Sequence, residues 1–143
     1  MFLGEYKHAL DDKGRVSIPV KFRAAIKSGA VVTRGLDNAL VLYTPGEWKV
    51  LAEKLSSLPI SQQNSRAFAR LMLAGAMDVK VDKQGRIAIP EYLRKYAGIK
   101  KNLVFAGLYN RLELWDEATW NTYKKKTESK SSDIAEQLGE LGI

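Results

Sequence analysis

The chain repeats itself, and this internal repeat constrains its fold more than any other feature. Residues 11–23 align with residues 82–94 at an offset of 71, and six of the aligned positions are identical. With one inserted residue, the match continues through the following segments as far as Trp48 and Trp120. A match that keeps its order over this length indicates a duplicated unit rather than chance similarity between two strand-rich segments.

Each copy predicts the same series of short elements. A strand, a tight Asp-x-x-Gly-Arg loop and a second strand lead to a proline that opens a short helix, and two more strands and a longer helix follow. The predicted strands cover residues 6–10, 15–18, 30–33 and 39–43 in the first copy, and 77–81, 86–89, 103–106 and 111–115 in the second. Thr44 and Asp116 are the predicted N-caps of the longer helices, and a further helix from about Ser61 to Gly75 links the copies.

The repeat also predicts the fold class and the domain boundaries. A half of about 50 residues buries too little surface to be stable alone, so the two copies are expected to share one core. We expect an α+β, mainly β protein with two tandem β-barrel repeats and short flanking helices. The boundaries are a first repeat at 1–55, a linking helix at 56–75, a second repeat at 76–120 and a polar tail at 121–143. In the tail, Ile134, Leu138 and Leu141 are spaced for one short amphipathic helix, and disorder is the alternative.

Composition and charge narrow the class of partner. The formal net charge is +7, and most of it comes from the stretches 7–23 and 78–95 around the two loops. That balance favours a polyanionic partner such as nucleic acid. The chain has no Cys, which excludes disulfides and thiol catalysis and fits a reducing cytosol. No apolar run is long enough for a transmembrane helix, and no signal peptide is expected.

The repeated loops supply the candidate site. We expect Asp11 and Asp82 to structure the loops by accepting hydrogen bonds from backbone N–H groups or by bracing the nearby arginine. Gly14 and Gly85 are expected to provide the positive φ that the turn needs.

Basic side chains in and beside the loops are the candidate DNA contacts. An arginine at the start of the second strand can bind guanine O6 and N7 or a phosphate, and lysines flanking the turn suit phosphates. The alternative for each arginine is a solvated or Asp-paired side chain. The DNA-binding candidates are Arg15, Arg86, Lys13, Lys83 and Lys7.

Nothing in the sequence predicts an enzyme. The only histidine, His8, is expected to be an ordinary surface or packed residue, and the adjacent Asp11 and Asp12 are expected to be turn residues. No nucleotide-binding, hydrolase or metal-ligand motif is present, so neither a metal nor a cofactor nor a small-molecule substrate is expected. The aromatic residues at equivalent repeat positions are interpreted as core packing rather than base stacking; they are Tyr43, Trp48, Trp115 and Trp120.

The chain resembles the MraZ family. The resemblance rests on the start Met1-Phe2-Leu3-Gly4, the two Asp-x-x-x-Arg motifs, the two Ile-Pro helix openings and the strand Leu112-Glu113-Leu114-Trp115 leading to Trp120. The motifs are intact, although Gln84 replaces Lys13 at the equivalent loop position, so the two loops need not contact DNA equally.

The resemblance implies a fold and a function. Both copies would have the AbrB/SpoVT/MazE-like swapped-hairpin fold. The protein would be a cytoplasmic, nucleoid-associated transcriptional regulator, generally a repressor of the division and cell-wall operon. It would bind short G-rich direct promoter repeats in double-stranded DNA as a ring-like homo-oligomer, with Arg15 and Arg86 as the motif arginines. A protein-interaction or antitoxin-like module, acting through the tail or an apolar groove, is the alternative function.

Overall fold

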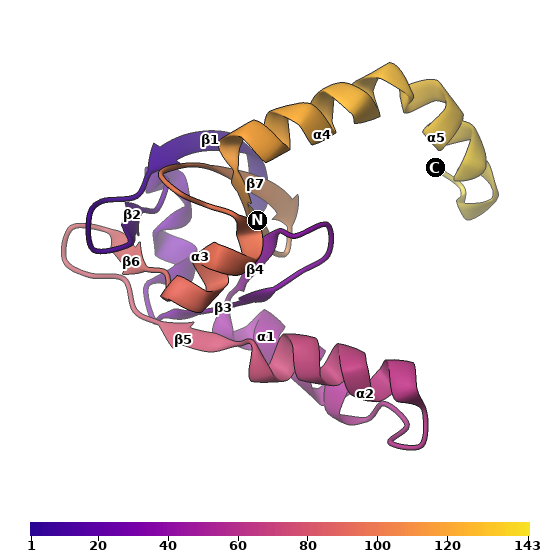
Figure 1. The fold of residues 1–143 in the computed structure, drawn as a ribbon, viewed down its shortest axis with the longest axis horizontal. Coiled ribbons are helices and arrows are strands. Elements are labelled where there is room, and N and C mark those ends of the chain that lie inside the picture. Colours follow the sequence, from indigo (N-terminus) through magenta and orange to yellow (C-terminus); the bar gives the residue numbers. More distant parts are fainter.

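The computed structural model describes all residues from 1 to 143. Eight strands and a set of short helices alternate along the chain (Figure 1). The strands are β1 (Phe2–Ala9), β2 (Arg15–Ser17), β3 (Ala30–Arg34), β4 (Leu40–Tyr43), β5 (Met77–Val79), β6 (Arg86–Ala88), β7 (Asn102–Tyr109) and β8 (Leu112–Asp116). Every strand predicted from the sequence is present, with ends that differ by a few residues.

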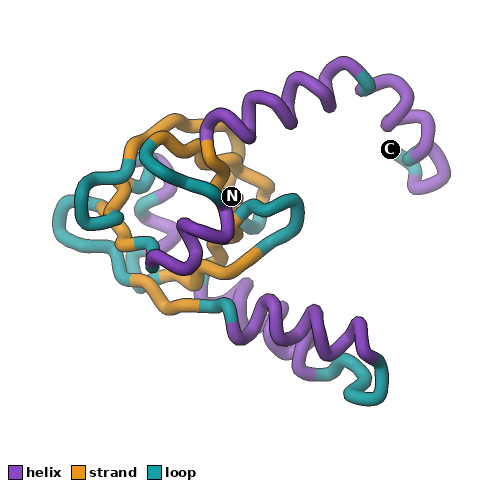
Figure 2. Tube along the Cα trace, viewed as in Figure 1, coloured by secondary structure: helices purple, strands orange, loops and turns teal.

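The helices vary more in length and type than the strands, from three-residue 3-10 turns to the thirteen residues of α4. Figure 2 shows that they flank the strands and extend beyond them on one side of the molecule. The α-helices are α1 (Pro45–Ser56), α2 (Gln63–Ala69), α3 (Glu91–Ala97), α4 (Glu117–Ser129) and α5 (Ser131–Gln137). The remaining turns are the 3-10 helices η1 (Val20–Phe22), η2 (Ala24–Ile26) and η4 (Gly139–Leu141), and the π-helix η3 (Arg70–Ala74). No helix has the length and apolar character needed to cross a membrane.

Strands of the two copies pair with one another. The larger sheet has six strands in the order β1-β7-β8-β4-β3-β5, and β2 and β6 form a separate two-stranded ribbon. The first strand of each copy pairs with the third strand of the other, β1 with β7 and β5 with β3, and all these pairs are antiparallel. Gly107 permits the long β1–β7 pairing, because a Cβ there would lie 2.5 Å from the backbone nitrogen of Leu3.

The predicted closed barrels are wrong. The six-stranded sheet is open, with β1 and β5 at its edges, and one sheet serves both copies. The physical reason is that β2 and β6 are only three residues long and use their ladder hydrogen bonds on each other. They therefore cannot close either half into a barrel. The coarser prediction, two tandem repeats rich in β-structure with flanking helices, is confirmed.

One main core joins the halves, as the shared-core prediction required. Its 20 buried residues come from both copies, and equivalent side chains such as Ile18 and Ile89 are at most 2 % exposed. Pro19 and Pro90 precede the short helical segments as predicted, but the first segment forms two 3-10 turns whereas the second forms the α-helix α3. Gly98 ends α3 in the left-handed conformation.

A smaller apolar cluster packs α1 and the linking helix on the outer side of the first copy. Thr44 caps α1, since its hydroxyl accepts from the N–H of Glu47 at 3.3 Å. The linking helix starts at Gln63 and ends at Gly75, and its last turn is the π-helix η3. The hydroxyl of Thr33 donates to the carbonyl of Met72 at 2.6 Å, which satisfies a backbone group at this irregular turn.

The second copy ends in a long exposed helix. Asp116 caps α4 as predicted, because its carboxylate accepts from the N–H of Thr119 at 3.2 Å. The helix continues to Ser129 and includes Lys124–Lys126, which lie in the stretch predicted as a polar tail. A short helix, α5, follows in the stretch where the sequence left helix and disorder open. The proposed boundaries at residues 55, 75 and 120 remain predictions.

Removing a shared-core side chain should destabilise both copies together. Ile87 is 1 % exposed on β6, so Ile87→Ala should lower the free energy of unfolding by about 2–5 kcal/mol through lost burial and a residual cavity. Val20→Ala is the control, because Val20 is 75 % exposed. Urea denaturation followed by circular dichroism measures both. An equal, small loss for the two variants would contradict the shared core.

Candidate nucleic-acid interface

The two repeated loops lie side by side at one end of the molecule, where β2 and β6 meet (Figure 1). In this ribbon Arg15 pairs with Ala88 and Ser17 with Arg86. The glycine of each loop accepts a hydrogen bond from the other copy, from Ile18 N–H to the Gly85 carbonyl and from Ile89 N–H to the Gly14 carbonyl, both at 2.9 Å. Residues 71 positions apart in the chain therefore form one continuous surface.

A single carboxylate organises the first loop. Asp11 Oδ1 accepts from the backbone N–H groups of Lys13 and Arg15, each at 2.9 Å. Asp11 Oδ2 accepts from the Nε–H of the Arg15 guanidinium at 2.7 Å. The carboxylate thus does both things that the sequence suggested: it holds the turn and it holds the arginine.

The second loop repeats this geometry. Asp82 Oδ1 accepts from the N–H groups of Gln84 and Arg86 at 2.9 Å, and Asp82 Oδ2 accepts from Arg86 Nε–H at 2.9 Å. Gln84 therefore fills the place of Lys13 without changing the loop, since only its backbone is used. Gly14 and Gly85 have φ of 74° and 78°, the left-handed conformation predicted for the turn.

These hydrogen bonds stabilise the charged form of each aspartate. They lower the pKa of Asp11 from 3.8 to about 2, and the Arg15 backbone N–H is the largest cause. The pKa of Asp82 is lowered for the same reason, first by the Arg86 backbone N–H. Both carboxylates are therefore ionised at neutral pH and remain paired with their arginines.

The motif arginines keep part of their hydrogen-bonding capacity. Each uses its Nε on its own aspartate, and Arg86 Nη1 also lies 3.8 Å from Asp11 Oδ2. The side chains of Arg15 and Arg86 are 32 % and 25 % exposed. Neither guanidinium is enclosed in the core, and the terminal nitrogens are available to a partner that approaches the ribbon.

Sequence reasoning missed two further arginines at the loops. Arg23 lies against Gly85 and Arg94 lies against Gly14, so each copy supports the loop of the other. A Cβ on Gly85 would lie 2.5 Å from Arg23 Cζ, and a Cβ on Gly14 would lie 2.9 Å from Arg94 Cζ. The available signal was that both are arginine at the last position of the aligned repeat.

These arginines are fixed by backbone carbonyls rather than by acids. Arg23 Nε–H donates to the Ile18 carbonyl at 2.8 Å, and Arg94 Nε–H donates to the Ile89 carbonyl at 3.0 Å. Neither one forms an ion pair with a carboxylate, so no adjacent acid offsets the positive charge that they place beside the loops. Arg23, Lys27 and Lys83 also line a hollow of about 310 Å³ next to Asp82.

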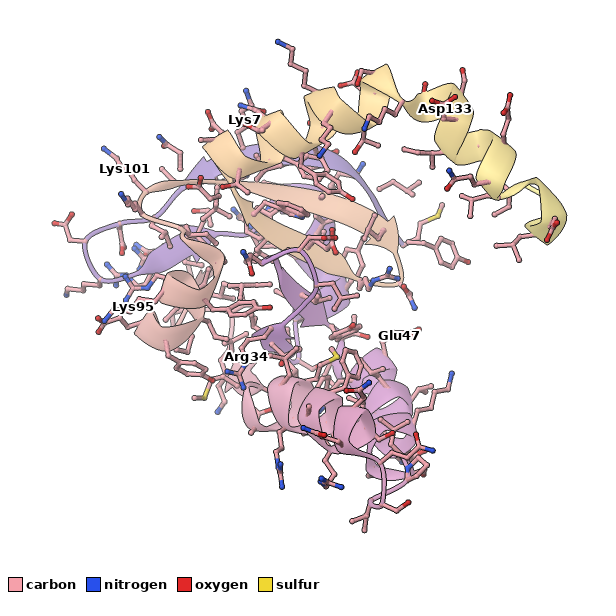
Figure 3. The ribbon with its side chains drawn as sticks, turned by 45° about the vertical axis from the view of Figure 1, so that its right-hand side comes forward. Lys7, Arg34, Glu47, Lys95, Lys101 and Asp133 are labelled. Carbon is pink, nitrogen blue, oxygen red and sulfur yellow. The ribbon has the colours of Figure 1, made fainter.

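The predicted lysines do not all lie together. Lys13 and Lys83 are exposed at the loop tips. Lys7 lies instead on the edge strand β1, in register with Val104 and near Glu5. Glu5 in turn binds Lys124 of α4 at 3.0 Å, and Figure 3 shows Lys7 on this side of the molecule, away from Lys95. The structure therefore separates Lys7 from the two loops.

The remaining sequence candidates have packing roles. The His8 ring contacts Phe105 edge-on with centroids 5.6 Å apart, and burial lowers its pKa. No group of three or more His, Cys, Asp or Glu side chains is arranged to hold a metal ion. Tyr43 and Trp115 are at most 8 % exposed, in agreement with core packing.

The fold and the site together define a class of protein: a tandem-repeat chain whose two copies exchange strands and display paired, arginine-bearing loops. The family model described as "MraZ protein, putative antitoxin-like" matches residues 1–71 and again residues 72–140. The chain belongs to the MraZ family.

Relatives match along their full length. Proteins named transcriptional regulator MraZ from Natranaerobius thermophilus, Halothermothrix orenii and Pediococcus pentosaceus are 46 %, 48 % and 48 % identical to this chain over 143 residues. In each case the match covers all of both chains. These relatives are named as transcriptional regulators and not as enzymes.

The loop carboxylate should titrate far below an ordinary aspartate. The pKa of Asp11 is about 2 in the folded protein and 3.8 for an ordinary aspartate. The ionised carboxylate therefore stabilises the folded protein above pH 4, and this contribution is lost as the pH falls through 2. Carboxyl NMR of the side chain measures the midpoint. In Arg15→Gln the midpoint should rise part of the way to 3.8, since the backbone N–H donors remain. A wild-type midpoint at 3.8 would contradict the loop geometry.

Gly85 should tolerate a side chain less well than another left-handed glycine. In Gly85→Ala the positive φ costs about 1–2 kcal/mol and the new Cβ also displaces Arg23. Gly98→Ala is the matched control, because Gly98 has φ of 64° and nothing within 4 Å of the added Cβ. Thermal unfolding should show a larger loss for Gly85→Ala, and equal losses would contradict the Arg23 contact.

Proposed function

We propose that the chain is a sequence-specific, double-stranded DNA-binding transcriptional regulator whose reading element is the β2–β6 ribbon with its two loops. The name shared by its relatives supports transcriptional regulation. The single observation that carries the DNA-binding proposal is the pairing of the two arginine-bearing loops in one ribbon. The major groove of B-DNA is about 12 Å wide and admits a two-stranded β-ribbon, so this element has a suitable shape.

Arg15 and Arg86 are the proposed sequence readers. A guanidinium with free terminal nitrogens can bind guanine O6 and N7 with two hydrogen bonds. Each arginine Nε–H is bonded to an aspartate, so the side chain has lost part of its rotamer freedom before DNA binds. Binding then costs less conformational entropy than it would for a mobile arginine.

The other cations are proposed to bind phosphates. Lys13 and Lys83 at the loop tips and the unpaired Arg23 and Arg94 surround the readers with positive charge. Such contacts position the protein and make its affinity depend on salt. Lys7, which lies towards α4, is proposed as an outlying phosphate contact.

The finer features of the proposal follow the family resemblance. The exchange of first strands between copies supports a swapped-hairpin fold of the AbrB/SpoVT/MazE type. We propose a cytoplasmic, nucleoid-associated repressor of the division and cell-wall operon that binds G-rich direct promoter repeats as a ring-like homo-oligomer. One pair of loops offers few contacts, and linked subunits would raise the effective concentration at successive DNA repeats.

Substitution of the readers should weaken and relax recognition of repeat-bearing promoter DNA. Arg15→Ala and Arg86→Ala should each lose ~1–3 kcal/mol of binding free energy on repeat DNA, and less on scrambled DNA of the same length. Arg66→Ala on α2 is the control, since its guanidinium donates to the carbonyl of Ile60, in the connection between α1 and α2 and not in either loop. Fluorescence anisotropy measures all four proteins, and unchanged affinity in both reader variants would refute the proposal.

Loss of a phosphate contact should have a different signature. Lys13→Ala should weaken binding to repeat and scrambled DNA alike, and should reduce the slope of log affinity against log salt by about 0.9. The same anisotropy assay from 50 to 200 mM salt measures the slope. A sequence-dependent loss at constant slope would assign Lys13 to base reading instead.

A further inference from the structure

The hollow beside the second loop is built by both copies. Arg23 and Lys27 come from the short helical segment of the first copy, whereas Asp82, Lys83 and Gly85 come from the loop of the second. It lies at the end of the molecule where the two loops meet (Figure 1), and its volume is about 310 Å³. The hollow exists only because the two copies are interlocked.

Three cations and one carboxylate line this hollow. None of the cations Arg23, Lys27 and Lys83 forms an ion pair with an acid. The carboxylate of Asp82 is already engaged, since it accepts from the Nε–H of Arg86 and from two backbone N–H groups at 2.9 Å. The hollow therefore carries an uncompensated positive charge, which favours an anionic ligand.

The arginine of the hollow is fixed before a ligand binds. Its Nε–H donates to the Ile18 carbonyl at 2.8 Å, and its guanidinium lies against Gly85. The two terminal nitrogens remain for a ligand, and a planar guanidinium suits the oxygens of a phosphate, to which lysines add point charges. Lys27 and Lys83 are exposed, so such a group can enter from solvent.

The equivalent position at the first loop has a different charge. The two loops have the same hydrogen bonds, and so do the arginines of the two short helical segments, so the residues of the hollow have counterparts at the offset of 71. One cation is kept and two are replaced: Arg94 corresponds to Arg23, Asp12 to Lys83, and Gly98 to Lys27.

No other cation restores the charge at the first loop. Lys95 lies in the corresponding helical segment, but its Nζ is 3.1 Å from Glu91 Oε1. Arg94 is thus a single unpaired cation beside the two carboxylates Asp11 and Asp12. Duplication has given the chain two similar loops, and only the second has a cationic hollow beside it.

We propose that this hollow binds one backbone phosphate of double-stranded DNA, and that each chain has one such site rather than two. The inference rests on the proposed function, in which the β2–β6 ribbon reads DNA through both loops. Both motif arginines would contact bases, whereas only the second loop would be fixed to the backbone by a built phosphate site. Because one phosphate belongs to one strand, each bound repeat would be anchored on one strand.

Removal of a hollow cation tests the site. Lys27→Ala should weaken binding to repeat and scrambled DNA alike, and its disadvantage relative to wild type should shrink roughly threefold between 50 and 200 mM salt, because one phosphate contact is lost. Lys95→Ala, on the corresponding segment beside the first loop, is the matched control and should keep the wild-type slope. Fluorescence anisotropy measures the three proteins, and equal slopes would overturn the proposal.

A scan of the DNA backbone locates the bound phosphate. A methylphosphonate linkage is neutral, and it is placed at one position of every repeat, on one strand at a time. At one position on one strand, wild-type protein should lose affinity and Lys27→Ala should lose nothing further, whereas the losses of Lys95→Ala should add at every position. Additive losses for Lys27→Ala at all positions would overturn the site.

The opposite change should create a second site. Asp12→Lys gives the first loop the charge that Lys83 gives the second, so affinity should rise and the salt slope should steepen. Asp133→Lys makes the same change of charge on α5 and should alter neither. An effect of Asp12→Lys no larger than that of Asp133→Lys would contradict the proposed difference between the loops.

Free phosphate is the other source of the same ligand chemistry. Inorganic phosphate is titrated into the DNA-free protein at constant ionic strength, with backbone amide NMR of residues 82–85 as the signal, and no saturation is expected. Saturable shifts that Lys27→Ala abolishes, together with additive losses in the backbone scan, would assign the hollow to free phosphate and overturn the proposal.

The two proposals fail in different ways. A Lys27→Ala variant with the wild-type slope, beside an Arg15→Ala variant that still loses affinity, would remove the phosphate site and leave DNA reading in place. Unchanged affinity in both reader variants would remove the proposed function itself, and the phosphate site with it.

Discussion

The pairing of β2 with β6 is the interaction on which the rest of the structure depends. It joins two segments 71 residues apart through the reciprocal bonds to the Gly14 and Gly85 carbonyls. Since each ribbon strand belongs to a different copy, neither copy can complete its own hairpin. The shared core and the adjacent loops are both consequences of this exchange.

The ribbon also explains why the loops can be charged and ordered at once. Each loop contains a carboxylate that is bonded to two backbone N–H groups and one guanidinium, so its negative charge is compensated locally. The glycine behind each loop leaves room for an arginine of the opposite copy. Two layers of arginine thus surround the ribbon, one paired with acids and one held only by carbonyls.

Local features of this fold could be predicted from the sequence, whereas long-range pairing could not. The caps Thr44 and Asp116 and the left-handed Gly14 and Gly85 depend on neighbouring residues, and the structure contains all four. The partner of each strand depends on backbone hydrogen bonds that carry no residue signature, and this is why closed barrels were predicted in place of one open sheet. Sequence reasoning missed Arg23 for the same reason, because its contact with Gly85 depends on how the two copies pair. The position of Lys7 apart from the loops was missed for a related reason: nearness in sequence was taken for nearness in space.

The central claim is that the two loops act as one DNA-binding element. Hydrogen–deuterium exchange with mass spectrometry, performed on the full chain with and without repeat-bearing promoter DNA, tests this claim most directly. The account predicts that bound DNA slows exchange in residues 11–18 and 82–89 together, and leaves α2 unchanged. Protection of only one of the two segments, or protection confined to the helices, would contradict it.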